Sequence, residues 1–190
     1  MKTYIDRINV YGFKSYGDRH LTIPIGPGFT AIVGPNGAGK SNIGDSIVFC
    51  LGIATARAMR ALKLTDLIFS SRDKSAPYAE VEIVFKNLGE FPINSEEIRI
   101  SRKVELSGKS TYKINGRVVK QKEVEDLLTQ AGIPTQGYNI VTQGDIYKFV
   151  NMTPAERREL LSEIAGITIY EEKKQKALID LKETQEKIDN

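Results

Sequence analysis

The sequence of 190 residues contains one cysteine, one histidine and no tryptophan. A lone cysteine, Cys50, excludes a disulfide framework, and together with His20 it cannot build a zinc site of histidine and cysteine ligands within the chain. No apolar run approaches the roughly 20 residues that cross a bilayer, and the N-terminus lacks the apolar stretch of a signal peptide. We therefore expect a cytoplasmic protein without a membrane partner, in which any metal is a hard ion held by oxygen ligands.

The charge is nearly balanced in total but not along the chain. Hydrophobic residues make up 41% and charged residues 27%, as in an ordinary soluble domain, and the formal net charge is +3. Between residues 99 and 122, however, there are eight basic residues and one acid, Glu105. Such a segment attracts polyanions, although a solvated strand face would carry a similar charge.

Alternation of apolar and polar residues predicts strands over much of the first 120 residues. The expected strands cover residues 8–12, 21–25, 79–85, 98–104 and 112–114. The pair Asn115-Gly116 predicts a tight turn after the last of them. The short apolar run Phe29–Val33 is typical of a strand that is buried on both faces.

Two amphipathic helices are expected in the same part of the chain. The first begins at about residue 40 and ends at Gly52, a typical C-terminal stop. Its apolar stripe consists of Ile43, Ile47, Cys50 and Leu51. The second helix runs from about Gln121 to Ala131, and residues 53–77 are expected to form a short helix and loops.

The segment from Gly34 to Ser41 fits the phosphate-loop pattern G-x-x-x-x-G-K-[ST]. Its glycines let successive backbone N–H groups point at phosphate oxygens, and the N-terminus of the following helix adds partial positive charge. Lys40 would reach the β- and γ-phosphates, and the Ser41 hydroxyl would bind Mg²⁺. A chance glycine-rich turn is the alternative, but the predicted strand, loop and helix are all in register. No Asn-Lys-x-Asp segment that reads guanine follows, which favours ATP over GTP.

The chain changes character from residue 153 onward. Thr153-Pro154-Ala155-Glu156 has the pattern of a capping box and predicts the start of a helix. A degenerate heptad seam then follows at Tyr170, Lys174, Ala177, Leu181, Thr184 and Ile188. An amphipathic surface helix is the alternative, but this helix has no stop signal, so we expect a neck helix and the root of a longer coiled coil. The expected division is residues 1–152 and residues 153–190.

An ordered set of motifs covers nearly the whole chain. They are Gly12-Phe13-Lys14-Ser15-Tyr16, the phosphate loop continued as Asn42-Ile43, Ala56-Arg57-Ala58-Met59-Arg60, Asp66-Leu67-Ile68-Phe69, Val141-Thr142-Gln143-Gly144-Asp145-Ile146 and Thr153-Pro154-Ala155-Glu156-Arg157-Arg158. This set resembles the N-terminal head segment of SMC (structural maintenance of chromosomes) proteins. The resemblance implies an α/β fold, the ABC-type ATPase head lobe of the P-loop NTPases, with a mixed or antiparallel sheet, helices and a coiled-coil root.

The resemblance also implies roles for residues at matching positions. Gln143 matches a glutamine that contacts Mg²⁺ and the γ-phosphate side, and its amide oxygen suits a hard cation. Arg60 matches an arginine that approaches the nucleotide and is linked to DNA-stimulated hydrolysis, with Arg57 as the competitor for that role. The implied catalytic residues are Lys40, Gln143 and Arg60. The implied nucleotide-binding residues are Lys14, Ser15, Gly34, Pro35, Asn36, Gly37, Ala38, Gly39, Lys40, Ser41, Asn42, Thr65 and Asp66, and the Mg²⁺ ligands are Ser41 and Gln143.

Two parts of a complete ABC-type site are missing after Gln143. The sequence has no Leu-Ser-Gly-Gly-like signature and no apolar strand ending in Asp-Glu, the pair that would supply a magnesium contact and the catalytic base. In SMC proteins a C-terminal head segment carries both. The resemblance therefore implies that this chain is half of a composite site, which binds Mg-ATP weakly alone and does not turn it over.

The resemblance further implies the partners and the biological role. Two SMC heads sandwich two ATP molecules, a kleisin subunit with its accessory proteins bridges the heads, and the arms enclose double-stranded DNA. The implied role is DNA entrapment, chromosome condensation and segregation in a nucleoid-associated complex. The candidate contacts with DNA phosphates are Arg57, Arg60, Lys63, Arg102, Lys103, Lys109, Lys113, Arg117, Lys120 and Lys122.

Two alternatives to an SMC subunit remain open from the sequence. A coiled-coil DNA-repair ATPase would share the phosphate loop and the glutamine motif, and would carry a zinc hook in place of a globular hinge. A non-catalytic DNA-binding scaffold would keep the phosphate loop without its activity.

Overall fold

The computed structural model describes residues 2–53, 55–57, 59–133, 140–141 and 151–164, together with Lys174, Ala177, Leu178 and Leu181. The chain divides into two compact units, Met1–Gln136 and Gly137–Asn190. The predicted functional division after residue 152 stays a prediction.

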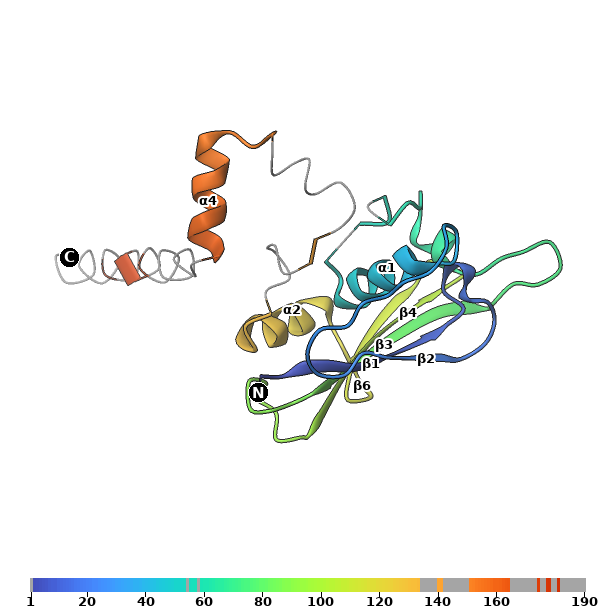
Figure 1. Ribbon diagram of the computed structural model, residues 1–190. Helices are drawn as coiled ribbons and strands as arrows, with labels where there is room; N and C mark the ends of the chain where they lie inside the picture. Colours follow the sequence, from blue (N-terminus) through green and yellow to red (C-terminus); the bar gives the residue numbers. More distant parts are fainter. Residues whose placement is uncertain are drawn as a thin grey trace, which may run out of the picture. The chain divides into compact units, whose positions relative to one another are not determined.

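The first unit is built on one antiparallel sheet of six strands in the order β2-β1-β3-β4-β5-β6 (Figure 1). The strands are β1 (Tyr4–Tyr11), β2 (Leu21–Pro24), β3 (Tyr78–Lys86), β4 (Glu97–Glu105), β5 (Ser110–Ile114) and β6 (Arg117–Val119). Its helices are α1 (Lys40–Leu51) and α2 (Gln121–Gln130), and short 3₁₀ turns form η1 (Lys14–Tyr16) and η2 (Leu64–Leu67). The predicted strands at 8–12, 21–25, 79–85, 98–104 and 112–114 and the predicted helix at 121–131 are therefore confirmed, within one or two residues at their ends except that β1 begins earlier, at Tyr4.

The core lies between the sheet and α1, which packs across β3 and β4. Side chains alternate along each strand, so that Val10, Val81 and Ile83 are fully buried on the face toward the helix. Phe49 of α1 packs there against Phe13, with their ring centres 5.2 Å apart.

The helix after the phosphate loop is confirmed, but its predicted stripe is only partly right. Gly52 ends α1 in the left-handed conformation, with φ of 73°. Cys50 is fully buried, whereas Ile43 and Ile47 are only half-buried, and Phe49 is fully buried instead. The reason is geometric, because the C-terminal turns of α1 lie over the sheet.

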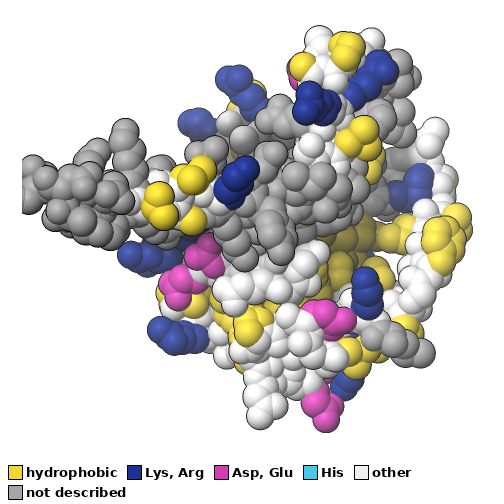
Figure 2. Space-filling model, turned by 90° about the vertical axis from the view of Figure 1, so that its left-hand side faces the viewer, with side chains coloured by type: hydrophobic (Ala, Val, Ile, Leu, Met, Phe, Trp, Pro, Cys, Tyr) yellow, Lys and Arg dark blue, Asp and Glu magenta, His cyan; other side chains and the backbone are white. Residues whose placement is uncertain are grey.

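The predicted buried strand at Phe29–Val33 is wrong. The structure has no strand there, and Phe29 is 95% exposed, Val33 88% and Ile32 44%. A strand buried on both faces needs a neighbouring strand and covering layers. In the described part of the chain, the six strands pair only with one another, so these residues have no partner. Hydrophobic side chains are seen at the surface in several places in Figure 2.

The second unit contains α4 (Pro154–Ile164). Its predicted capping box is confirmed, because the Thr153 backbone N–H and hydroxyl donate to Glu156 Oε2, at 2.6 and 2.7 Å. Lys174, Ala177 and Leu181 of the predicted seam are helical and exposed, whereas Tyr170, Thr184 and Ile188 lie outside the described residues. No helix in the described part of the protein is both long and apolar enough to span a membrane.

Candidate functional site

Residues 34–39 form a turn that leads directly into α1, whose first residue is Lys40. Gly37 and Gly39 have φ of 82° and 89°, in the left-handed region that favours glycine. The Lys40 Nζ donates hydrogen bonds to the backbone carbonyls of Gly34 and Pro35, both at 2.8 Å. The loop is therefore curled around the lysine amine, and the predicted contact of Lys40 with phosphates stays a prediction.

The N-terminus of α1 is open to an anion. It has no side-chain cap and no acidic residue in its first turn, and Ser41 is exposed there. The N–H groups of a first helical turn have no partner within the helix, and they point along the axis with partial positive charge. Together with the Lys40 amine they fit a polyphosphate, and the Ser41 hydroxyl suits a hard cation bound to it.

The η1 turn braces the phosphate loop from the side. The Asn42 Nδ2 donates to Ser15 Oγ at 2.8 Å, and the Tyr16 hydroxyl donates to the carbonyl of Gly39 at 3.1 Å. Burial raises the pKa of Tyr16 to about 12, and the nearby Asp45 carboxylate adds to the shift. The phenol therefore stays protonated and remains a donor at neutral pH.

A cluster of charges lies behind this brace. Lys14 Nζ lies 2.5 Å from Asp45 Oδ2 and 2.6 Å from the carbonyl of Met59, and the Arg60 Nη2 contacts the same Asp45 oxygen. Lys14 and Arg60 were predicted site residues, and the structure brings them together. Asp45 was missed by sequence reasoning, although an acid four residues after Ser41 lies on the same side of a helix and could have signalled it.

The segment that follows Arg60 lies beside η1. Phe13 and Ile68 form an isolated bridge, and the N–H of Phe69 donates to the carbonyl of Gly12 at 2.8 Å. Asp66 Oδ2 accepts hydrogen bonds from the N–H groups of Leu62 and Lys63, so this carboxylate caps η2.

The predicted contacts with the nucleotide and with Mg²⁺ stay predictions. The approach of Thr65 and Asp66 to an adenine stays a prediction. Gln143 lies outside the described residues.

Arg102 is not a surface residue, which corrects its assignment as a DNA contact. It is 7% exposed, and its guanidinium donates to the carbonyl of Phe49 and to Ser110 Oγ, both at 3.0 Å. The guanidinium also lies over the rings of Phe49 and Tyr112, at 4.7 and 4.8 Å from their centres. Since it lies on the inner face of β4, it cannot reach a phosphate in solvent.

The remaining basic residues of this segment divide into two groups. Lys103 lies over the ring of Tyr78 and 3.4 Å from Glu105, and Lys122 pairs with Asp126 at 3.5 Å. The side chains of Lys109, Lys113, Arg117 and Lys120 have no ion pair among the described residues. Arg57 and Lys63 are exposed, and Lys63 immediately precedes η2.

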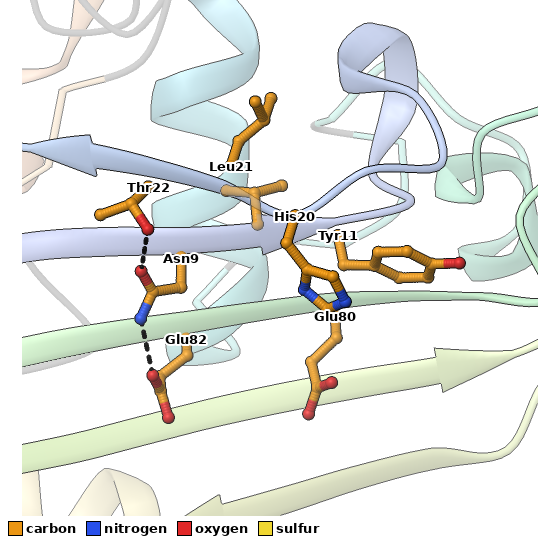
Figure 3. A pocket seen from close by; sticks show the side chains of 8 residues that line it. Asn9, Tyr11, His20, Leu21, Thr22, Glu80 and Glu82 are labelled. Carbon is orange, nitrogen blue, oxygen red and sulfur yellow. Dashed lines mark hydrogen bonds between the residues drawn. The ribbon is translucent and has the colours of Figure 1, made fainter.

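The outer face of the sheet carries an open hollow of about 400 Å³ over β1, β2 and β3 (Figure 3). Thr22 donates to Asn9 at 2.9 Å and Asn9 donates to Glu82 at 2.8 Å, while His20 stacks on Tyr11. Thr22, Asn9 and Glu82 thus form one chain of hydrogen bonds, and no predicted site residue lines the hollow.

The phosphate loop, the helix that follows it and the antiparallel sheet beneath define a nucleotide-binding lobe of the ABC-type ATPase class. The chain belongs to the RecF/RecN/SMC N terminal domain family, whose model matches residues 4–180. The predicted resemblance to the SMC head is thereby confirmed.

The relatives give the same assignment. The chain is 55% identical to the chromosome partition protein Smc of Aquifex aeolicus and 51% identical to that of Pyrococcus furiosus, over 98% and 97% of its length. It spans only 16% of the length of these curated relatives.

Solved structures resemble the chain over most of its length. A crystal structure of the Smc head domain of Pyrococcus furiosus, with an extended coiled coil and bound to the C-terminal domain of ScpA, is 51% identical with a TM-score of 0.87. The match covers 97% of this chain and 47% of that one. A chain from work on ATP-driven dimerization and DNA-stimulated activation of SMC ATPases is 52% identical with a TM-score of 0.78, over 85% of this chain and 99% of that one. A RecF–ATP structure, 20% identical with a TM-score of 0.54, shares the fold.

Proposed function

We propose that this chain is the ATP-binding half of an SMC-type ABC ATPase head, which acts in DNA entrapment, chromosome condensation and segregation in the cytoplasm. The observation that carries the proposal is the loop at residues 34–39 curled around the Lys40 amine at the open N-terminus of α1. The matches to chromosome partition proteins support this role over that of a repair ATPase.

Each residue of the loop has a definite task in this proposal. Lys40 and the backbone N–H groups of residues 37–41 hold the β- and γ-phosphates. Ser41 and Gln143 hold Mg²⁺, which neutralises charge on the phosphates when it is bound. Arg60 approaches the nucleotide from the adjoining turn, and Lys14 and Ser15 flank it.

The proposal requires a second polypeptide segment. The exposed apolar residues Phe29, Ile32 and Val33 come immediately before the phosphate loop. A C-terminal head segment that covers them would also bring the signature motif and the catalytic acid, which this chain lacks. ATP then joins two completed heads, and a kleisin subunit with its accessory proteins bridges them.

Equilibrium binding of ATP tests the nucleotide site. The chain is expected to bind Mg-ATP weakly, and Lys40→Ala is expected to abolish that binding, because the amine and the loop hold the phosphates. Ser41→Ala should remove the effect of Mg²⁺ and leave binding without Mg²⁺ unchanged. If the Lys40→Ala variant bound ATP as tightly as the parent, the phosphate loop would not be the ATP site. The chain would then be a scaffold that merely keeps the loop sequence.

Hydrolysis by the isolated chain is the second test. We expect none, because the catalytic base is supplied by the C-terminal segment. Measurable turnover by the purified chain, lost on Lys40→Ala substitution, would contradict the proposed half-site.

The surface that meets DNA is proposed to include Lys109, Lys113, Arg117 and Lys120, which have no ion pair within the described part of the chain, with Arg57 and Lys63. Each phosphate contact contributes about 0.9 to the slope of log affinity against log salt. Glutamate at Lys109, Lys113 and Lys120 should therefore flatten the slope for duplex DNA. Lys86→Glu is the control, since Lys86 already pairs with Glu96 at 2.9 Å. An unchanged slope would remove this segment from the DNA surface.

A further inference from the structure

We propose that Asp45 is a positioning residue, which holds Arg60 and Lys14 in place beside the phosphate loop and so makes hydrolysis depend on a contact behind the site. The inference rests on the proposed function, because it concerns how the cations of that same site are placed.

A single carboxylate oxygen joins two cations from separate segments. Asp45 Oδ2 accepts from Lys14 Nζ in η1 and from Arg60 Nη2 in the turn after α1. The Asp45 side chain is only 11% exposed, whereas that of Arg60 is 49% exposed. A carboxylate this buried needs positive partners, and here it has two. In the Asp45–Arg60 ion pair, the carboxylate on α1 is therefore the buried partner and the Arg60 guanidinium is the more exposed one.

Asp45 is directly linked to the phosphate loop through α1. It follows Ser41 by four residues, so the two lie on one side of the helix, about 6 Å apart along its axis. Lys14 belongs to the turn whose next two residues contact Asn42 and Gly39. A displacement of Asp45 or of its partners is therefore transmitted to the residues that surround the phosphates.

Both cationic residues, Lys14 and Arg60, have an unusual backbone conformation. Lys14 and Arg60 have φ of 48° and 59°, and in the described part of the chain Asn115 is the only other non-glycine residue with positive φ. Such a conformation is strained for a residue with a side chain, and it persists where surrounding contacts hold it. Lys14 also donates to the carbonyl of Met59, the residue before Arg60. The contacts centred on Asp45 thus hold both the side chain and the backbone at Arg60.

A double-mutant cycle in the assembled head, this chain joined by its C-terminal head segment, tests the inference. Asp45→Ala and Arg60→Ala should each lower kcat by about tenfold, and the double variant should also lose about tenfold, because Arg60 acts only when Asp45 places it. Independent effects that multiply to about 100-fold would overturn the proposal, as would a rise of kcat in Asp45→Ala.

Matched variants separate positioning from general charge and from folding. Arg57→Ala removes the same charge from an exposed position three residues earlier, and its effect should multiply with that of Asp45→Ala. Asp45→Asn keeps the size and one acceptor oxygen, so it should fold like the parent and recover part of kcat, with KM for ATP unchanged. If Asp45→Asn matches Asp45→Ala in kcat and raises the KM for Mg-ATP and the Kd for Mg-ADP by the same factor, the role is structural and the proposal is wrong.

The same measurements distinguish this inference from the proposed function. Lys40→Ala in the assembled head should abolish nucleotide binding whatever stands at position 45. Binding that survives Lys40→Ala would contradict the proposed function itself. Binding lost on Lys40→Ala, combined with independent effects of Asp45 and Arg60, contradicts only the role of Asp45.

Discussion

Arg102 is predicted from the sequence to be a DNA contact, but the structure places it in the core. It stands among eight basic residues, yet it lies on the inner face of β4, opposite Val81 on one side and Tyr112 on the other. Burial lowers the pKa of its guanidinium, while contacts with Phe49 and Ser110 supply acceptors for its N–H groups. It is a residue of the core, in which the aliphatic part of the side chain packs and the charge is shared with π faces.

Arg102→Ala is therefore expected to destabilise the fold instead of weakening DNA binding. We expect the free energy of unfolding to fall by about 3 kcal/mol, because the change leaves a cavity and unpaired acceptors. Urea unfolding measures the loss. Arg117→Ala, at an exposed position of β6, is the control and should change stability by less than about 0.5 kcal/mol. If the two variants were equally stable, the result would contradict the buried position of Arg102.

The reactivity of the Cys50 thiol gives a second test at the level of a single residue. Its thiol is fully buried and donates to the carbonyls of Val81 and Ile100, and burial raises its pKa to about 12. We expect no reaction with a disulfide reagent at pH 8 until denaturant unfolds the chain, because the thiolate is the reacting form. Ser107→Cys, in the exposed turn between β4 and β5, should react at once. Similar rates for the two thiols in the native protein would contradict the packing of α1.

Among the elements, α4 depends on contacts within one turn of its start. Thr153 and Glu156 exchange hydrogen bonds across the first turn, and Pro154 occupies the first helical position. These contacts lower the pKa of Glu156, chiefly through the hydrogen bond from the Thr153 backbone and then through its hydroxyl. The charged carboxylate is therefore the form that stabilises the helix.

The helix start should respond to acid in a defined direction. A lowered pKa in the folded state means that this contribution is present above the ordinary value of 4.5 and is lost as the pH falls through the lowered pKa. Thr153→Ala removes the hydroxyl but keeps the backbone N–H, so it should return the Glu156 pKa only part of the way toward 4.5, and it should cost the helix about 1 kcal/mol. NMR titration of the Glu156 carboxyl measures both proteins. A Glu156 pKa that is the same with and without the Thr153 hydroxyl would show that the hydroxyl contact of the capping box is absent in solution.

The whole molecule has an apolar segment that its own fold does not cover. Phe29, Ile32 and Val33 stand open to solvent, while the strands of the described sheet pair only with one another. Contiguous exposed apolar side chains are a common property of surfaces that bind another polypeptide, and the proposed C-terminal head segment would bind this one. This is the feature of the molecule as a whole that supports a composite head.

Serine at Phe29 and Val33 should separate folding from assembly. We expect the double variant to self-associate less than the parent and to bind the C-terminal head segment at least about 100-fold more weakly, since burial of the two side chains contributes about 3 kcal/mol or more. Sedimentation and a pull-down of the segment measure this. Leu106→Ser, which also removes an exposed apolar side chain, is the control and should leave the affinity unchanged. Undiminished assembly of the double variant would show that the segment docks elsewhere.

The sequence by itself determined the features that depend on near neighbours. The turn around Lys40, the strands from Tyr78 to Ile114 and the capping box at Thr153 follow from spacing, glycine conformation and hydrogen bonds within a few residues. Only the tertiary structure decided the inward direction of Arg102 and the sharing of Asp45 by two distant cations. It also left residues 29–33 exposed where their pattern predicts burial. Burial and charge pairing between residues far apart in sequence depend on which surfaces come into contact. Local periodicity of the sequence does not determine those contacts.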